Sequence, residues 1–292
     1  MEIDLSIATF LKLIKEKENL NNITLAEYMD SSPALISLYL SNSIRIMPNK
    51  IEALSNCLKE NKQKEFLDYI FESFPVGFYH GSRNGIKGEI DCYINKDKMH
   101  DFGYGFYLGT TFKQSSTFIS GEDNDEARIY KYSFSLDGLD YLKLDGVIWA
   151  LFVAYQRKKI PNIKENQHLI KQIQKIINHH YDVIIGPIAD DKISMTMDNF
   201  FANNITLDQL LNALTQLDIG VQYCLKTEKA SQNLKLENIY NVKERTLRYL
   251  IKEYAYISIQ SASTNAYLIN KQNLKGKKFS DLVKEYAKKP LF

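Results

Sequence analysis

The hydrophobic pattern of this 292-residue chain changes its period at residues 74–77, and the change restricts the folds that the chain can adopt. Before this Phe-Pro-Val-Gly segment, apolar residues recur at the spacing of helices; after it, short apolar runs alternate with helical segments. Proline and glycine so close together interrupt regular structure. The pattern therefore predicts an α+β chain in three parts: an all-α module over residues 1–74, a mixed segment over 75–240 and a helical extension over 241–292.

The first 74 residues are expected to form five short helices, over residues 5–17, 24–29, 32–40, 48–58 and 62–71. Thr24, with Glu27 three positions later, fits a capping box at the second helix. Ser32 followed by Pro33 fits the start of the third helix. This order of helices and turns resembles the lambda-repressor-like helix-turn-helix family, in which the helix that begins near Ser32 would enter the major groove of DNA.

The charge of this module argues against strong DNA binding. Residues 1–75 contain 8 Lys and Arg against 11 Asp and Glu, a balance of −3, whereas DNA affinity depends on neutralising phosphates. Only Arg45, Lys50 and lysines of the first helix could contribute. Binding to DNA and docking of a protein partner, such as a cognate antitoxin, both stay open. We expect removal of the first 75 residues to leave the activity of the rest nearly intact.

Two glycine-containing segments follow the boundary. The first is Tyr79-His80-Gly81-Ser82, and the second is Asp-Phe-Gly-Tyr-Gly-Phe-Tyr-Leu at 101–108. Strands are predicted at 78–80 and 106–109, with a helix over 112–118. The glycines at 103 and 105 allow a positive φ or a close approach of the backbone to a ligand. Asp101 is expected to cap this turn.

In this order the two segments resemble the His-Tyr-Glu signature of ADP-ribosyltransferases of the poly(ADP-ribose) polymerase and diphtheria-toxin branch, which have a split β-sheet core. The resemblance implies that NAD+ binds between the strands of His80 and Tyr107. His80 would bind ribose hydroxyls, and Tyr107 would pack under the nicotinamide. The implied cofactor-binding residues are Gly81, Ser82, Gly105, Ser115 and Phe118, the last facing Tyr107 where the polymerases usually have tyrosine.

The third signature position falls on Gln222 instead of glutamate. Glutamine offers hydrogen bonds without the negative charge, so the resemblance implies transfer of a single ADP-ribose unit. Glu228, six residues later, is the alternative occupant of this position. On this view, Gln222→Glu is expected to retain or increase NAD+ cleavage.

Three further segments are similar to a family of bacterial ADP-ribosyltransferase-like proteins. They are Trp149 to Phe152, one residue shorter than the family spacing, Tyr181 to Asp191, and Gln222 to Ala230. The likeness spans about residues 77–235. Asp190 and Asp191 are expected to form a turn or a helix cap, since adjacent carboxylates seldom point the same way.

The resemblance implies a bacterial toxin or anti-phage effector that modifies a protein or nucleic-acid acceptor. The alternatives are a helix-turn-helix transcription regulator that senses NAD+ or ADP-ribose without turnover, and an NAD+ glycohydrolase. Residues 233–292 contain 12 Lys and Arg against 5 Asp and Glu. Their lysines would guide a nucleic-acid substrate; otherwise they form a solvated face.

Residue content predicts a cytoplasmic protein without metal. Cys57, Cys92 and Cys224 are far apart, so neither a zinc site nor a disulfide framework is expected. No apolar run approaches the roughly twenty residues of a membrane span. The acidic start of the chain does not fit a secretory signal, so no membrane partner is expected.

Overall fold

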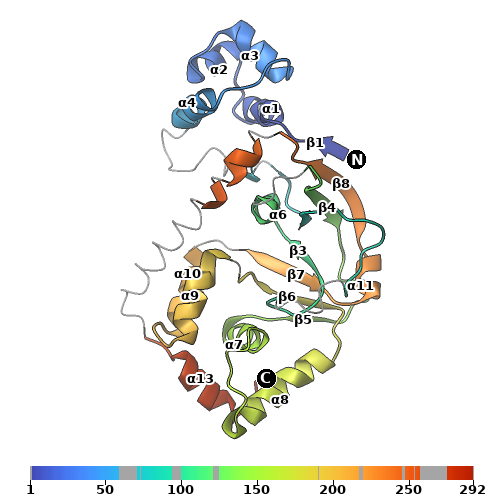
Figure 1. The fold of residues 1–292 in the computed structure, drawn as a ribbon, viewed down its shortest axis with the longest axis vertical. Helices are drawn as coiled ribbons and strands as arrows, with labels where there is room; N and C mark the ends of the chain where they lie inside the picture. The colour runs from blue at the N-terminus through green and yellow to red at the C-terminus, as the bar shows by residue number, and fades with distance from the viewer. Residues whose placement is uncertain are drawn as a thin grey trace. The chain divides into compact units, whose positions relative to one another are not determined.

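Two units make up the computed structural model, and each joins segments that are far apart in the sequence (Figure 1). The first unit contains Met1–Gly85, Thr111–Tyr132 and Leu236–Ala255, and the second contains Ile86–Thr110, Ser133–Lys235 and Tyr256–Phe292. The structure describes residues 2–58, 71–72, 74–93, 100–120, 125–189, 191–216, 220–244, 247–252, 254–256 and 275–291. The helix expected over 62–71 lies, apart from Phe71, outside the described residues, and so does Asp190.

Four helices open the first unit: α1 (Ile7–Lys17), α2 (Asn22–Tyr28), α3 (Pro33–Leu40) and α4 (Pro48–Leu58). The Ser32 side chain caps α3 by accepting from the Leu35 N–H, as its sequence predicts. The capping prediction for α2 is wrong: Asn21, not Thr24, accepts from the first-turn N–H groups, and the helix begins two residues before Thr24. Asparagine is a stronger N-cap than threonine, which accounts for the earlier start.

The strands of the first unit are β1 (Glu2–Asp4), β8 (Lys235–Asn241), β4 (Arg128–Ser133) and β2 (Phe78–Ser82), in that order across the sheet. β1 pairs with β8 in parallel, and β2 pairs with β4 antiparallel. The helix predicted from Asn241 is wrong at its start, because Asn241 ends β8 and its side-chain amide donates to Glu2 and Asp4. Residues 242–244 are not helical either, whereas residues 247–252 are helical.

The core of the first unit joins the N-terminal helices to these strands. Phe74, from the segment predicted as a domain boundary, stacks on Phe112 with ring centroids 3.8 Å apart and meets Phe10 at 6.2 Å. Phe112 belongs to α6 (Phe112–Ile119), which also packs on Tyr79 of β2. The two units therefore do not coincide with the three consecutive parts predicted from the sequence.

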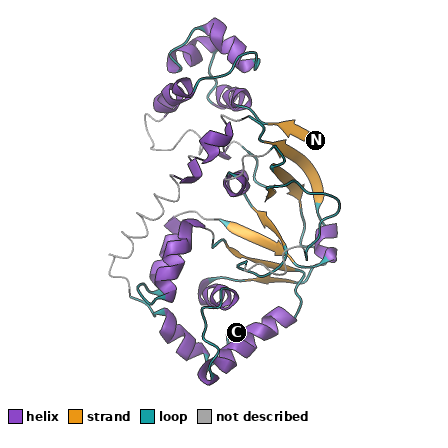
Figure 2. Ribbon diagram, in the orientation of Figure 1, coloured by secondary structure: helices purple, strands orange, loops and turns teal. Residues whose placement is uncertain are grey.

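The second unit contains β3 (Phe106–Gly109), β7 (Val221–Leu225), β6 (Val183–Pro187) and β5 (Tyr141–Lys143), in that order. β7 is antiparallel to both neighbours, and β5 is parallel to β6. The helices of this unit, shown in purple in Figure 2, are α7 (Gly146–Gln156), α8 (Gln167–Asn178) after a short 3-10 turn (Lys164–Asn166), α9 (Asp191–Phe201), α10 (Leu207–Gln216), α11 (Glu228–Gln232) and α13 (Phe279–Tyr286).

Helix α7 is the centre of the second core. Its residues from Trp149 to Ala154 are all buried, as expected for a helix with apolar residues around its whole circumference. Helix α8 instead has one apolar face. Both units combine helices with strands paired in parallel and antiparallel, in agreement with the predicted α+β class. Among the described helices, none is long and apolar enough to cross a membrane.

Candidate functional site

Gly81 of β2 lies directly under helix α6. A Cβ atom at this position would be 2.6 Å from the backbone oxygen of Ser115 and 3.2 Å from the Phe118 ring, so only glycine fits. Ser115 is buried and Phe118 is 55% exposed. The structure thus brings three of the sequence-predicted binding residues together within the first unit.

His80 lies on the other face of β2, because side chains alternate along a strand. Its ring is 6.5 Å from the ring of Tyr130, its partner on β4. Ser82 shares the His80 face by the same alternation. The signature histidine and the Gly81–α6 contact therefore belong to opposite faces of one strand.

Arg83 covers one face of the Phe118 ring. Its guanidinium carbon lies 4.8 Å from the ring centroid, and its nitrogens donate to the Phe118 carbonyl at 3.4 Å. A cation over an aromatic face is attracted by the ring quadrupole. A group that stacks on this face of Phe118 must therefore displace Arg83, a feature that the sequence interpretation missed.

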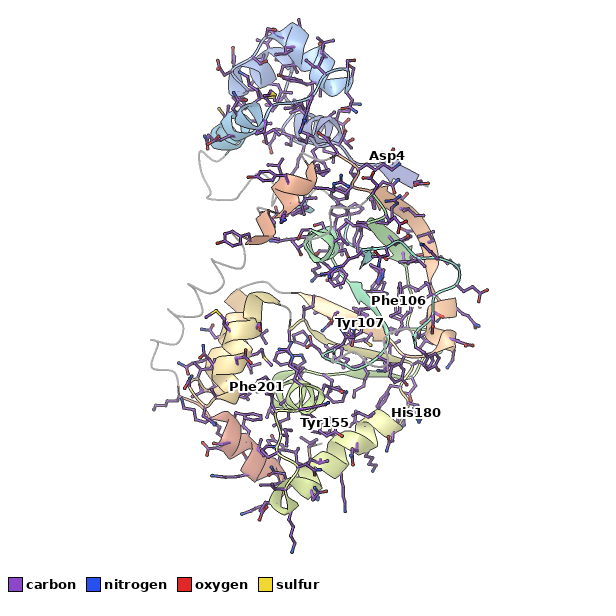
Figure 3. The ribbon with its side chains drawn as sticks, viewed as in Figure 1. Asp4, Phe106, Tyr107, Tyr155, His180 and Phe201 are labelled. Carbon is purple, nitrogen blue, oxygen red and sulfur yellow. The ribbon has the colours of Figure 1, made fainter. Side chains whose placement is uncertain are left out.

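The Tyr107 side chain, labelled in Figure 3, closes the glycine turn that precedes β3. Its hydroxyl donates to the Gly103 carbonyl at 2.6 Å and accepts from the Phe102 N–H at 3.2 Å. Gly103 has a φ of +76°, as the sequence suggested. Burial raises the pKa of Tyr107 well above its ordinary value, so the hydroxyl stays protonated. The Tyr107 ring lies 5.4 Å from the His100 ring and packs against the core of the second unit.

Gly105 is required by packing within the second unit. A Cβ atom there would be 2.3 Å from the Cys224 Sγ and 2.8 Å from the Leu225 carbonyl oxygen, both on β7. The backbone φ of +153° also favours glycine. The close approach that the sequence assigned to a ligand is made here by a neighbouring strand.

Gln222 lies on the same face of the β3–β7 pair as Tyr107. Tyr107 is paired with Cys224, two residues from Gln222, and Gly109 is paired with Gln222 itself. Opposite residues of an antiparallel pair share a face, so the two side chains are diagonal neighbours. Glu228, the alternative third signature residue, is an exposed residue in the first turn of α11.

The Asp101 carboxylate holds Gln222 and two other parts of the second unit. One oxygen accepts from the Gln222 amide nitrogen at 3.2 Å and from the Ala189 N–H at 3.0 Å. The other accepts from Arg157 at 2.7 and 3.2 Å. Asp101 was expected only to cap its turn. Its partners are 56 to 121 residues away in sequence, and no local pattern points to them.

A second carboxylate, Asp182, connects the segment 181–191 with the segment 222–230. It accepts from Thr227 at 2.6 Å, from Lys229 at 3.0 Å and from the Asp140 N–H at 3.0 Å. Burial would raise the pKa of Asp182, but these hydrogen bonds together hold it below the ordinary value. Thr227 and Lys229 of the segment 222–230 thus have a structural function.

Lys226 also holds the glycine turn. Its ammonium donates to the carbonyls of Phe102, at 2.8 Å, and Tyr104, and lies 3.9 Å from the centroid of the Tyr104 ring. Burial lowers the pKa of Lys226. Residues 102–107 are therefore fixed by hydrogen bonds from both Lys226 and Tyr107.

Several of the cations that could attract nucleic acid are bound to groups of the chain itself. Lys50 binds the carbonyl and carboxylate of Asp30. Lys277 and Lys289 both pair with Glu285. Lys278 donates to the Asn204 carbonyl at 3.0 Å. These contacts weaken the electrostatic case for DNA binding by α3 or for a nucleic-acid groove at the C-terminal segment.

A family model matches residues 76–236, and its description is "Protein of unknown function (DUF3990)". The match covers more than half of the chain, so the chain belongs to this family. Comparisons with curated proteins and with solved structures gave no match.

Proposed function

We propose that the chain is an NAD+-dependent mono-ADP-ribosyltransferase that modifies a macromolecular acceptor, either protein or nucleic acid. The main support is the position of Tyr107 and Gln222. These residues, which the signature assigns to NAD+, are diagonal neighbours on one face of the β3–β7 pair despite their distance in sequence. The contact of Gly81 with Ser115 and Phe118 adds support from the first unit.

In the proposed reaction, the Tyr107 ring packs against the nicotinamide, and the Gly81 backbone and Ser115 hold its carboxamide. His80 binds ribose hydroxyls, and Gln222 contacts the nicotinamide ribose. The bond between ribose and nicotinamide breaks through an oxocarbenium-like state. The electron pair of that bond leaves with neutral nicotinamide, and the acceptor nucleophile bonds to the anomeric carbon and releases its proton to water. A function as a toxin or anti-phage effector rests on family analogy alone.

Binding is tested by thermal unfolding with NAD+. A ligand that binds only the native protein at a hundred times its Kd stabilises it by about 2.7 kcal/mol. We expect NAD+ to raise the Tm of the wild type, and His80→Ala to remove most of the rise. His179→Ala is the control, because His179 is exposed at the end of α8 and pairs with Asp140. Equal rises in both variants would contradict the assignment of His80.

A sensor of NAD+ without turnover is the rival proposal, and one observation favours it. The Gln222 side chain has no charge, and its amide nitrogen is already bound by Asp101 and the Pro187 carbonyl. Nicotinamide release distinguishes the transferase from the sensor. NAD+ would raise the Tm of a sensor, but the sensor would release no nicotinamide. Release without labelling of any macromolecule would instead indicate an NAD+ glycohydrolase.

A further inference from the structure

The amide nitrogen of Gln222 faces two groups that can only accept hydrogen bonds. They are the Asp101 carboxylate, at 3.2 Å, and the Pro187 carbonyl, at 3.3 Å. An amide oxygen in that place would meet two other oxygens without a proton between them. The identity of the atom there is therefore fixed by its surroundings, and the Gln222 Oε1 must be at the opposite end of the amide.

The Oε1 atom is the end of Gln222 that remains for a ligand. Within the described part of the chain, no donor reaches it. An amide oxygen has two lone pairs and no proton, so it accepts from hydroxyl or N–H groups and repels phosphate oxygens. Gln222 is 8% exposed, so its rotation is restricted.

Asp101 is itself held in place. Arg157 donates two hydrogen bonds to one carboxylate oxygen and a further one to the Ala189 carbonyl, while the Ala189 N–H donates to the other oxygen. The side chain of Asp101 is 12% exposed and that of Arg157 is 23% exposed. Because Arg157 balances the charge of Asp101, the main effect of Asp101 on Gln222 is orientation, not added negative potential.

We propose that Asp101 is a positioning residue that fixes the Gln222 amide so that Oε1 accepts a hydrogen bond from a hydroxyl of the nicotinamide ribose. This inference rests on the proposed function. Gln222 would then supply the hydrogen-bond acceptor that the glutamate of the signature supplies, without its negative charge. The inference also reverses the sequence-based expectation for Gln222→Glu, because a carboxylate at 222 would face Asp101 and the Pro187 carbonyl with no donor of its own.

The test compares two buried carboxylates of the second unit. Asp182 resembles Asp101: its side chain is 11% exposed and it accepts from a cation, a polar side chain and a backbone N–H. We would measure nicotinamide release from NAD+ in a bacterial lysate, with kcat expressed per folded molecule. Asp101→Asn should lower kcat about a hundredfold, the cost of misplacing a reacting group, with KM changed less than about threefold. Asp182→Asn should lower Tm and leave kcat unchanged.

A reciprocal pair of variants keeps the test decisive if Asp101→Asn does not fold. Gln222→Glu should lose activity. In Asp101→Asn/Gln222→Glu, the new amide at 101 can donate to the carboxylate at 222, and kcat should recover about tenfold, an ordinary coupling between contacting residues. No recovery in the double variant would overturn the proposal.

The outcomes distinguish this inference from the proposed function. If the wild type releases nicotinamide and Asp101→Asn has the kcat of Asp182→Asn, the inference fails and the function stands. If the wild type releases no nicotinamide, the proposed transferase fails and the inference fails with it.

Discussion

Substituting Gly105 by alanine tests whether the glycine turn before β3 is built for packing or for a ligand. The added Cβ would lie 2.3 Å from the Cys224 Sγ, far inside van der Waals contact, and the backbone φ of +153° is unfavourable for alanine. Overpacking of a core costs about 2 kcal/mol, and a backbone conformation reserved for glycine costs about 2 kcal/mol more. We therefore expect a loss of about 4 kcal/mol in the free energy of unfolding.

Differential scanning calorimetry with and without NAD+ measures this loss. For a unit of this size, about 4 kcal/mol lowers Tm by about 10 °C. Gly138→Ala is the matched control in the same unit, because Gly138 has a φ of +72° but no atom within 4 Å of its added Cβ. That variant should lose only about 1 kcal/mol, the cost of the backbone conformation.

Removing the clashing sulfur should recover part of the loss. In Gly105→Ala/Cys224→Ala the new methyl group takes space vacated by Sγ, so the double variant should be more stable than Gly105→Ala alone. Packing as the reason for Gly105 would be refuted if the unfolding free energy of Gly105→Ala were within about 1 kcal/mol of the wild-type value while NAD+ no longer stabilised the variant. That result would return Gly105 to the ligand site that the sequence suggested.

Further predictions concern stability, the N-terminal helices and DNA. The folded-state pKa of Asp182 is lowered, so the stability that Asp182 contributes is complete above its unfolded pKa of about 3.9 and is lost as pH falls through the folded value. Asp182→Asn should therefore flatten the acid side of a plot of unfolding free energy against pH. An unchanged acid side would contradict the assigned hydrogen bonds. Deleting the first 75 residues removes Phe10 and Phe74 from a core shared with Phe112, so we expect the Tm to fall clearly. An unchanged Tm would show that the N-terminal helices are a separable module. Any DNA affinity of that module should be modest and fall steeply with salt, whereas salt-independent binding measured by fluorescence anisotropy would oppose this view.

The sequence predicted those helices and strands that have a capping residue or a clear apolar pattern within their own residues. Ser32 and Pro33 start α3, and the wholly apolar stretch from Trp149 forms a buried helix. The strands β2 and β3 were both expected within two residues of their positions. In each of these, a cap or an apolar run of sufficient length is present in the sequence itself.

Elements that depend on distant partners were missed. β8 begins with three exposed residues, so its pattern is weak. The sequence predicts no strand there, although the end of β8 pairs with β1 at the N-terminus. The same limit applies to the site. Gln222 was named from a motif, but its contact with Asp101 joins residues 121 positions apart. The sequence therefore indicated candidate residues and not the direction in which the Gln222 amide points.

The proposed transfer of ADP-ribose from NAD+ to a macromolecule can be followed with labelled NAD+. The purified chain would be incubated in a bacterial lysate with NAD+ labelled in the adenine, followed by separation of protein from nucleic acid. We predict a covalently labelled acceptor in one of the two fractions, with one ADP-ribose per site and equimolar nicotinamide, and loss of the label in Tyr107→Ala. The absence of label from both fractions, with the folded wild type present, would contradict the account.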